Sequence, residues 1–286
     1  MNRSRPPGRL KQRAITALLL LPVVVGALVY LPSAWLGVAV GVFVLVAARE
    51  WAMLSGLTRV GEQTAYLMVL ALIGVVGLWV VHDIPAAAAV VAALGVIWWI
   101  CALVGLLAAS DSYGGIFRFL PVRLVAGVLA LVPAWLTTIY LHATDPKSPA
   151  GVLFVFALVW IADSSAYFVG KAWGRTKLAP NVSPGKTVEG LLGAVAAVVV
   201  LAYICGTMIW HLQGSILFMW IAVAVTALFF SVVGDLVESK LKRVAGVKDS
   251  GTWLPGHGGA LDRIDALTAA VPAFVFAWVL LLDIQA

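Results

Sequence analysis

Charged side chains gather in one short stretch of this 286-residue chain, between Gly234 and Asp265. Only 11% of the residues are charged, yet this stretch holds five of the thirteen acidic residues and five of the nineteen Lys and Arg. Asp235 and Glu238 are three residues apart, as are Asp262 and Asp265, so each pair would share one helical face. Carboxylates bind hard cations such as Mg²⁺. The stretch therefore suggests phosphoryl or nucleotidyl transfer, in which metal ions neutralise charge on phosphate oxygens.

The same stretch carries the positive charge that such a reaction needs. Ser239 would hydrogen-bond a phosphate or a backbone carbonyl. Close backbone approach to a ligand is permitted by the run Pro255-Gly256-His257-Gly258-Gly259. The other histidines, His82, His142 and His211, fall near the ends of the membrane spans predicted below, on the side of the membrane opposite to this stretch. A zinc cluster around His257 is therefore not expected. The basic residues, candidates for holding a phosphate, are Lys240, Lys242, Arg243, Lys248 and Arg263.

Apolar runs flank the charged stretch on both sides. Residues 216–234 are interrupted only by Thr226 and Ser231, and residues 266–282 are again largely apolar. The charged stretch is therefore expected to be a loop between two membrane spans, with carboxylates at both of its ends. Carboxylates so close to hydrocarbon are costly and are expected to be partnered and functional. As a bare count of charges, the stretch fits a solvated connector equally well.

The composition indicates an all-α, polytopic transmembrane protein. The chain is 63% hydrophobic, with a mean hydropathy of +1.04, and its apolar runs are long enough for helices to cross a bilayer. The two cysteines lie in apolar runs, so neither a disulfide framework nor a CxxC metal motif is expected. The nine predicted spans are residues 14–31, 34–48, 64–81, 85–109, 124–142, 150–170, 188–210, 214–234 and 264–283.

The basic residues predict the orientation of these spans. All Lys and Arg except Lys147 fall on the same side of the predicted topology. The positive-inside rule then places the N-terminus in the cytoplasm, and the first span is interpreted as an uncleaved helix rather than a signal peptide. The basic excess is thus a topology signal, and no nucleic acid is expected as a partner. Residues 1–142 are expected to form a scaffold, and residues 150–286 a catalytic region with cytoplasmic loops at 171–187 and 235–265.

A second polar region lies around the sixth predicted span. Asp163 within it would either bond Ser or Tyr on neighbouring helices or serve as a metal or substrate ligand in a polar cavity. In the basic loop that follows, Ser183 is expected to cap the next helix and Pro184 to occupy its first position. This helix start, with Lys186 beside it, would hold a phosphate through backbone N–H groups. Pro180 stands where a P-loop needs glycine, so that motif is excluded.

Three groups of residues in this sequence form motifs of defined residue types at defined spacings. The longest reads Ser239-x-Leu241-Lys242-Arg243-x₄-Lys248-Asp249-x-Gly251-x₂-Leu254-Pro255-x-His257-Gly258-Gly259-x₂-Asp262-Arg263-Ile264-Asp265. The second reads Asp163…Ala166-Tyr167-Phe168…Gly170-Lys171…Gly174, then Lys177-Leu178…Pro180…Ser183-Pro184…Lys186-Thr187…Glu189-Gly190. The third comprises Leu10-Lys11-Gln12-Arg13 and Arg49-Glu50. Together they resemble the signature of the CTP:phosphatidate cytidylyltransferases, the CDP-diacylglycerol synthases. One departure is Ala260, where a larger aliphatic residue is commoner, which concerns packing only.

The resemblance implies a membrane enzyme that converts phosphatidate and CTP to CDP-diacylglycerol and pyrophosphate and requires Mg²⁺, with K⁺ proposed as a second cation. The candidate catalytic residues are Asp235, Asp262, Lys248 and Arg263. The candidate metal ligands are Asp235, Asp262 and Asp265, and the alternative for Asp265 is a cap at the start of the ninth span. The candidate substrate-binding residues are Ser239, Lys240, Lys242, Arg243, Asp249, His257, Gly258, Gly259, Lys186 and Asp163.

In such a reaction the lipid phosphate would attack the α-phosphorus of CTP, and metal and cationic side chains would stabilise the equatorial oxygens. The attacking phosphate is already anionic, so no protein nucleophile is needed. The expected partners are CTP, phosphatidate and membrane lipids, and a homodimer is left open. The composition fits a bacterial inner membrane, with the active site expected to face the cytoplasm.

Two other functions stay open at this point. A related membrane enzyme that uses CTP on another lipid, such as a polyprenol kinase or an archaeal-type CDP-lipid synthase, needs similar charges. An ion-coupled transporter would use the carboxylates as an ion pathway. The sequence has no detectable internal repeat of the kind many transporters carry, and its carboxylates gather at one membrane face. Both features count against transport.

Overall fold

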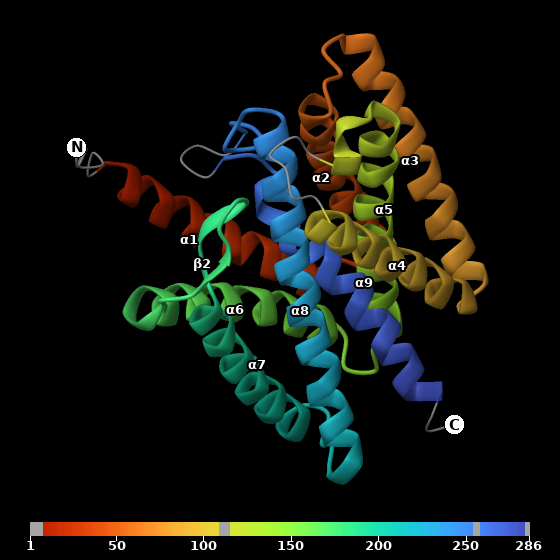
Figure 1. The fold of residues 1–286 in the computed structure, drawn as a ribbon. Helices are drawn as coiled ribbons and strands as arrows, with labels where there is room; N and C mark the ends of the chain where they lie inside the picture. The colour runs from red at the N-terminus through yellow and green to blue at the C-terminus, as the bar shows by residue number, and fades with distance from the viewer. Residues whose placement is uncertain (1–7, 109–114, 254–257, 284–286) are drawn as a thin grey trace.

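The computed structural model describes residues 8–108, 115–253 and 258–283, and it is almost entirely helical (Figure 1). The all-α prediction is confirmed, with one small β-hairpin added to it. The helices are α1 Gly8–Tyr30, α2 Ser33–Leu54, α3 Val60–Asp83, α4 Ala86–Ala108, α5 Leu120–Thr144, α6 Ala150–Trp173, α7 Val188–Met208, α8 Gly214–Val244 and α9 Leu261–Asp283. A 3-10 turn spans Gly115–Arg118, and the hairpin strands are β1 Lys177–Ala179 and β2 Ser183–Thr187.

Eight of the described helices, α2 to α9, are long and apolar enough to cross a membrane. Part of α1, Leu19–Tyr30, forms a shorter apolar segment. Each of the nine helices overlaps one of the nine predicted spans. A polytopic membrane protein is therefore confirmed, while the cytoplasmic N-terminus and the division at residues 142 and 150 stay predictions.

Helices α8 and α9 lie between two groups of helices (Figure 1). Helices α4 and α5 contact α9 on one side, and α6 and α7 contact α8 on the other. Trp220 of α8 joins several of these helices: its ring lies 4.7 Å from that of Phe154 on α6 and 5.6 Å from that of Phe274 on α9. Its Nε1 donates a hydrogen bond of 2.9 Å to the carbonyl of Ala202 on α7. The two helices that carry most of the charged residues of this stretch are thus held by packing on both sides.

One glycine lets α8 and α9 approach each other closely. A β-carbon at Gly234 would lie 2.5 Å from the carbonyl oxygen of Asp265 and 3.1 Å from the β-carbon of Ala269. Real side-chain atoms do not approach a backbone oxygen so closely, so only glycine fits here. The close crossing brings Asp265, the second carboxylate of the α9 pair, next to the end of the apolar part of α8.

The expected boundary of α8 is wrong. The helix does not end near Gly234 but continues ten residues further, to Val244, so the first third of the charged stretch is helical. Gly246 has a positive φ of 72°. Its N–H bonds the carbonyl of Arg243, and the N–H of Val247 bonds the carbonyl of Lys242, which is the Schellman arrangement that ends many helices. The side chains from Asp235 to Arg243 are therefore held on a rigid element rather than on a loop.

The expected start of α7 is also wrong. Ser183 and Pro184 do not begin the helix but belong to β2, which pairs antiparallel with β1. Proline is tolerated there because a two-stranded sheet has open edges where a backbone N–H is not needed. The helix begins at Val188, and the side chain of Thr187 caps it by accepting a hydrogen bond from the N–H of Gly190.

Candidate active site

The first charge pair of the site joins the hairpin to α8. Lys186 Nζ on β2 lies 2.6 Å from Asp235 Oδ2 on α8, with both side chains partly exposed. One turn further along α8, the hydroxyl of Ser239 donates a hydrogen bond of 3.2 Å to Asp235 Oδ1. Of the predicted site residues, these three lie together in the structure, and β2 is the element that carries the lysine to the aspartate.

The second charge group is more deeply buried and links α8 to α9. Lys242 Nζ lies 2.5 Å from Glu238 Oε2, one turn earlier on α8, and 2.6 Å from Asp262 Oδ1 on α9. The side chains of Lys242 and Asp262 are 10% exposed, and that of Glu238 is 2% exposed. One ammonium group thus balances two buried carboxylates.

Two more aspartates extend this cluster. Asp163 stands on an exposed part of α6, close enough to Asp235 and Lys186 to interact with their charges. Asp265, one turn after Asp262 on α9, interacts with Glu238 and Asp235. It is not a cap for α9, because the helix begins four residues earlier, at Leu261. Carboxylates packed this closely repel one another unless protons or cations lie between them.

The loop between α8 and α9 closes on Asp262. Its Oδ2 accepts hydrogen bonds of 2.9 Å from the N–H groups of Ser250 and Gly259. Gly258, which has a positive φ of 80°, leaves no room for a β-carbon beside the same oxygen, 2.6 Å away. The glycine pair thus closes on a carboxylate of the site, and its close approach to a ligand stays a prediction.

The remaining predicted residues lie around this cluster or outside it. Arg243 is exposed and donates to the carbonyl of Val247, away from the carboxylates. Lys240 is buried on α8, and Arg263 is exposed at the start of α9. Lys248 and Asp249 are exposed on the loop after α8. His257 lies outside the described residues.

A buried glutamate of α2 was missing from the predicted site. Glu50 accepts hydrogen bonds from Ser250 Oγ at 2.8 Å, Ala260 N at 3.0 Å and Leu261 N at 2.9 Å. Glu238 was noticed as a neighbour of Asp235 but not assigned to the site, although it shares Lys242 with Asp262. The sequence signal for Glu50 was its place at the end of an apolar run, where a charged residue needs a partner.

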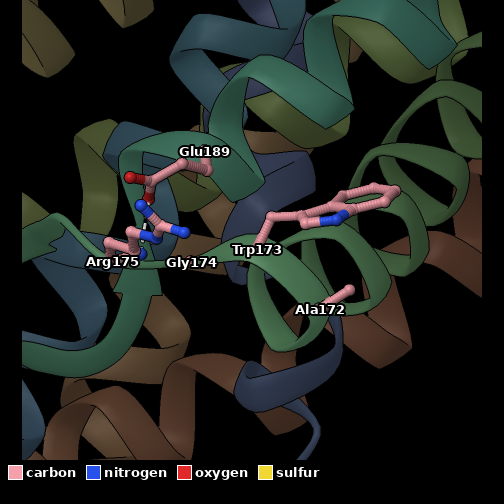
Figure 2. A pocket seen from close by; sticks show the side chains of 5 residues that line it. All are labelled: Ala172, Trp173, Gly174, Arg175 and Glu189. Carbon is pink, nitrogen blue, oxygen red and sulfur yellow. Dashed lines mark hydrogen bonds between the residues drawn. The ribbon is translucent and has the colours of Figure 1, made fainter.

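An open pocket of about 400 Å³ lies where α6 turns into the hairpin. Figure 2 shows its lining, with the side chains of Arg175 and Glu189 close together and the ring of Trp173 apart from them. The carboxylate of Glu189 accepts hydrogen bonds from the N–H groups of Arg175 and Thr176 at 3.0 and 3.1 Å. This contact fixes the turn that precedes β1. The pocket shares no lining residue with the charged cluster.

The carboxylates fit a hard cation by their chemistry. Aspartate and glutamate oxygens are the ligands that Mg²⁺ takes, and the buried carboxylates of Glu238 and Asp262 share a single ammonium group, that of Lys242. In the described part of the chain, no three acidic, His or Cys residues are grouped closely enough to hold a metal. Lysine ammonium groups stand between the carboxylates instead, at Lys186 and Lys242. The carboxylates thus hold an ammonium group at two neighbouring places, one at Asp235 and one between Glu238 and Asp262.

Comparison with known proteins identifies the family. Residues 11–281 match the model of the cytidylyltransferase family, which is nearly the whole chain. The chain belongs to the cytidylyltransferase family. As a cytidylyltransferase it is an enzyme of the nucleotidyltransferase class, and the charged cluster of α8 and α9 lies within the matched region.

Curated relatives of this cytidylyltransferase are bacterial. A protein of Pseudomonas aeruginosa named phosphatidate cytidylyltransferase is 41% identical over 268 residues, covering 93% of this chain and 95% of that protein. One of the same name from Haemophilus influenzae is 36% identical over 290 residues, covering 93% and 98%. A third, from Bacillus subtilis, is 45% identical over 132 residues, covering 44% of this chain and 47% of that protein.

Proposed function

We propose that this enzyme is a phosphatidate cytidylyltransferase, which forms CDP-diacylglycerol and pyrophosphate from phosphatidate and CTP. The observation that carries the proposal is the cluster in which Lys186, Lys242 and five carboxylates meet at α6, β2, α8 and α9. It lies inside a family match that covers nearly the whole chain, and relatives similar over most of their length are named for this activity.

The charges of the cluster suit a reaction between two phosphates. The phosphate of the lipid attacks the α-phosphorus of CTP, a bond forms between them, and pyrophosphate leaves with the electron pair. Lys186 and Lys242 each neutralise a carboxylate in the free protein. An incoming triphosphate would compete for the same ammonium groups, and charge-assisted hydrogen bonds from lysine to phosphate oxygens would then orient it.

We propose that Asp235, Asp262 and Asp265, with Glu238 beside them, would hold Mg²⁺ together with the phosphate oxygens of the substrates, because the described acidic residues alone are not grouped closely enough to hold a metal. When bound, it would neutralise phosphate oxygens and so lower the barrier to attack. The carboxylates of Asp235, Asp262 and Asp265 would supply the oxygen ligands, and their positions on α8 and α9 would set the distances between those ligands. A second cation such as K⁺ stays a prediction.

The membrane setting suits the lipid substrate. Asp163 is exposed on the surface of α6, so a phosphate headgroup could approach the cluster from the side of the bilayer while its acyl chains stay in hydrocarbon. We propose that the cluster faces the cytoplasm, because the basic residues of its loops lie on the side that the positive-inside rule assigns to it. The bacterial relatives support a place in an inner membrane, and a homodimer stays a prediction.

The proposal is tested with the purified full chain in detergent, supplied with CTP and phosphatidate with and without Mg²⁺. Wild-type protein should form CDP-diacylglycerol and pyrophosphate only with Mg²⁺, and Asp262→Asn should lose at least about a hundredfold in kcat, by analogy with other groups that stabilise transition-state charge. Asp83→Asn is the matched control, because Asp83 is an exposed carboxylate at the end of α3. Equal activity of Asp262→Asn and wild type would overturn the assignment.

A further inference from the structure

Glu50 is a buried carboxylate of α2 that reaches a segment 200 residues later in the chain. Only 3% of the residue is exposed. Its two oxygens accept three hydrogen bonds, from Ser250 Oγ at 2.8 Å, Ala260 N at 3.0 Å and Leu261 N at 2.9 Å. A buried carboxylate without such donors would be strongly destabilising. The contact between α2 and this loop is therefore a built feature of the fold.

Two of the three donors to Glu50, the N–H groups of Ala260 and Leu261, lie at the beginning of α9. The first amides of any helix have no partner within the helix. Here the N–H of Leu261 bonds Glu50, and the N–H of Asp262 bonds Ser250 Oγ at 3.3 Å, which itself donates to Glu50. A negative charge at a helix N-terminus is also favoured by the helix dipole. Glu50 thus caps α9 from another helix.

The loop that bonds Glu50 also holds Asp262, and Ser250 contacts both carboxylates. Ser250 gives its hydroxyl to Glu50 and its N–H to Asp262, while Gly259 gives its N–H to Asp262. A β-carbon at Gly259 would collide with Glu50 Oε2 and Ser250 Oγ, and one at Gly251 would collide with Glu50 Oε1. The loop is therefore shaped around Glu50, and its geometry passes directly to Asp262.

We propose that Glu50 is a positioning residue of the active site: by fixing Ser250 and the first turn of α9, it sets the place of Asp262 opposite Lys242. The proposal rests on the proposed function for its catalytic consequence only. Helix α2, which was expected to belong to the scaffold, would then contribute a residue that positions the active site.

The test uses Glu50→Gln, which keeps the shape but replaces one acceptor oxygen by an NH₂ group. At least one of the three donors then loses its partner, and hydrogen bonds to charged groups are strong. We expect kcat to fall about tenfold to a hundredfold, with KM for CTP changed less than about threefold. Tyr66→Phe is the matched control, because it removes one partly buried hydrogen bond, 3.1 Å long, from Tyr66 on α3 to the carbonyl of Leu124.

Two further measurements separate positioning from a general loss of stability. Hydrogen–deuterium exchange is measured on the full chain without substrates. The amides of residues 258–262 should exchange faster in Glu50→Gln than in wild type, and at the wild-type rate in Tyr66→Phe. Ser250→Ala should lower kcat in the same way, and the double variant should lose less than the product of the two single losses, because both act through one contact. Ser250→Ala also serves if Glu50→Gln does not fold.

Three results would overturn the proposal: wild-type kcat in Glu50→Gln or Ser250→Ala, a loss no greater than in Tyr66→Phe, or unchanged exchange at residues 258–262. If wild-type protein forms no CDP-diacylglycerol, the proposed function fails instead. The exchange measurement then still decides whether Glu50 holds the loop.

Discussion

Removing the ammonium group of Lys242 should destabilise the protein more than removing any exposed lysine. Its Nζ lies 2.5 Å from Glu238 and 2.6 Å from Asp262, and all three side chains are at most 10% exposed. Lys242→Met leaves an apolar chain of similar length but two buried carboxylates without their cation. Breaking a buried ion pair in this way costs about 3–5 kcal/mol. At roughly 2–4 °C per kcal/mol, the unfolding midpoint should fall on the order of 10 °C.

The assay is thermal unfolding of the purified protein in detergent, followed by circular dichroism at one scan rate. Lys147→Met is the matched control, because Lys147 is exposed in the turn between α5 and α6, and its midpoint should stay within about 2 °C of wild type. The double variant Lys242→Met/Glu238→Gln should recover part of the loss, since it removes one of the two unbalanced charges. Lys242→Met with a wild-type midpoint, or a double variant less stable than Lys242→Met, would refute the reasoning.

Three other substitutions test the geometry of the site. Gly259→Ala should cost about 1–3 kcal/mol of stability and abolish most activity, because its β-carbon meets the side chains that hold the start of α9; unfolding and product assays check both. Gly234→Val should lower the unfolding midpoint by separating α8 from α9 at the carbonyl of Asp265. Lys186→Met should change stability by less than about 1 kcal/mol, since its pair with Asp235 is partly exposed, yet raise KM for CTP. A wild-type KM for Lys186→Met would remove this lysine from the triphosphate site.

Hydropathy alone located the spans but not the end of α8. Apolar length marks where a helix crosses hydrocarbon, and the signal stops at Gly234 because charged residues follow. The helix nevertheless continues, and Leu, Glu, Lys and Arg are strong helix formers. Gly246 is the kind of residue that ends helices. Propensity and capping signals together would have extended the prediction to Val244.

The hairpin was missed because the sequence Ser183-Pro184 fits two structures. Serine followed by proline is typical of a helix start, but proline is also accepted in an edge strand. The signal that decides between them is Pro180-Asn181, which favours a tight turn. The structure has that turn, with the N–H of Val182 bonded to the carbonyl of Ala179.

The chain order of the charged residues suggested which of them to consider for a site, but not the contacts that they make. Spacing brought Asp235, Asp262 and Asp265 into consideration, but it could not show that Lys242 lies between Glu238 and Asp262. That contact depends on how α8 crosses α9. The contact of Glu50 with the loop is also invisible to spacing, because the partners are 200 residues apart and only the packing of α2 against α9 brings them together.

The most direct test of the account follows the phosphorus atoms of CTP. Full-length protein in detergent with Mg²⁺ and phosphatidate is given CTP labelled in either the α or the γ position. The account predicts that the α label enters the lipid product together with the cytidine, while the γ label is released in pyrophosphate. Transfer of the γ label to the lipid would show a kinase instead, and it would contradict cytidylyl transfer at the cluster of α8 and α9.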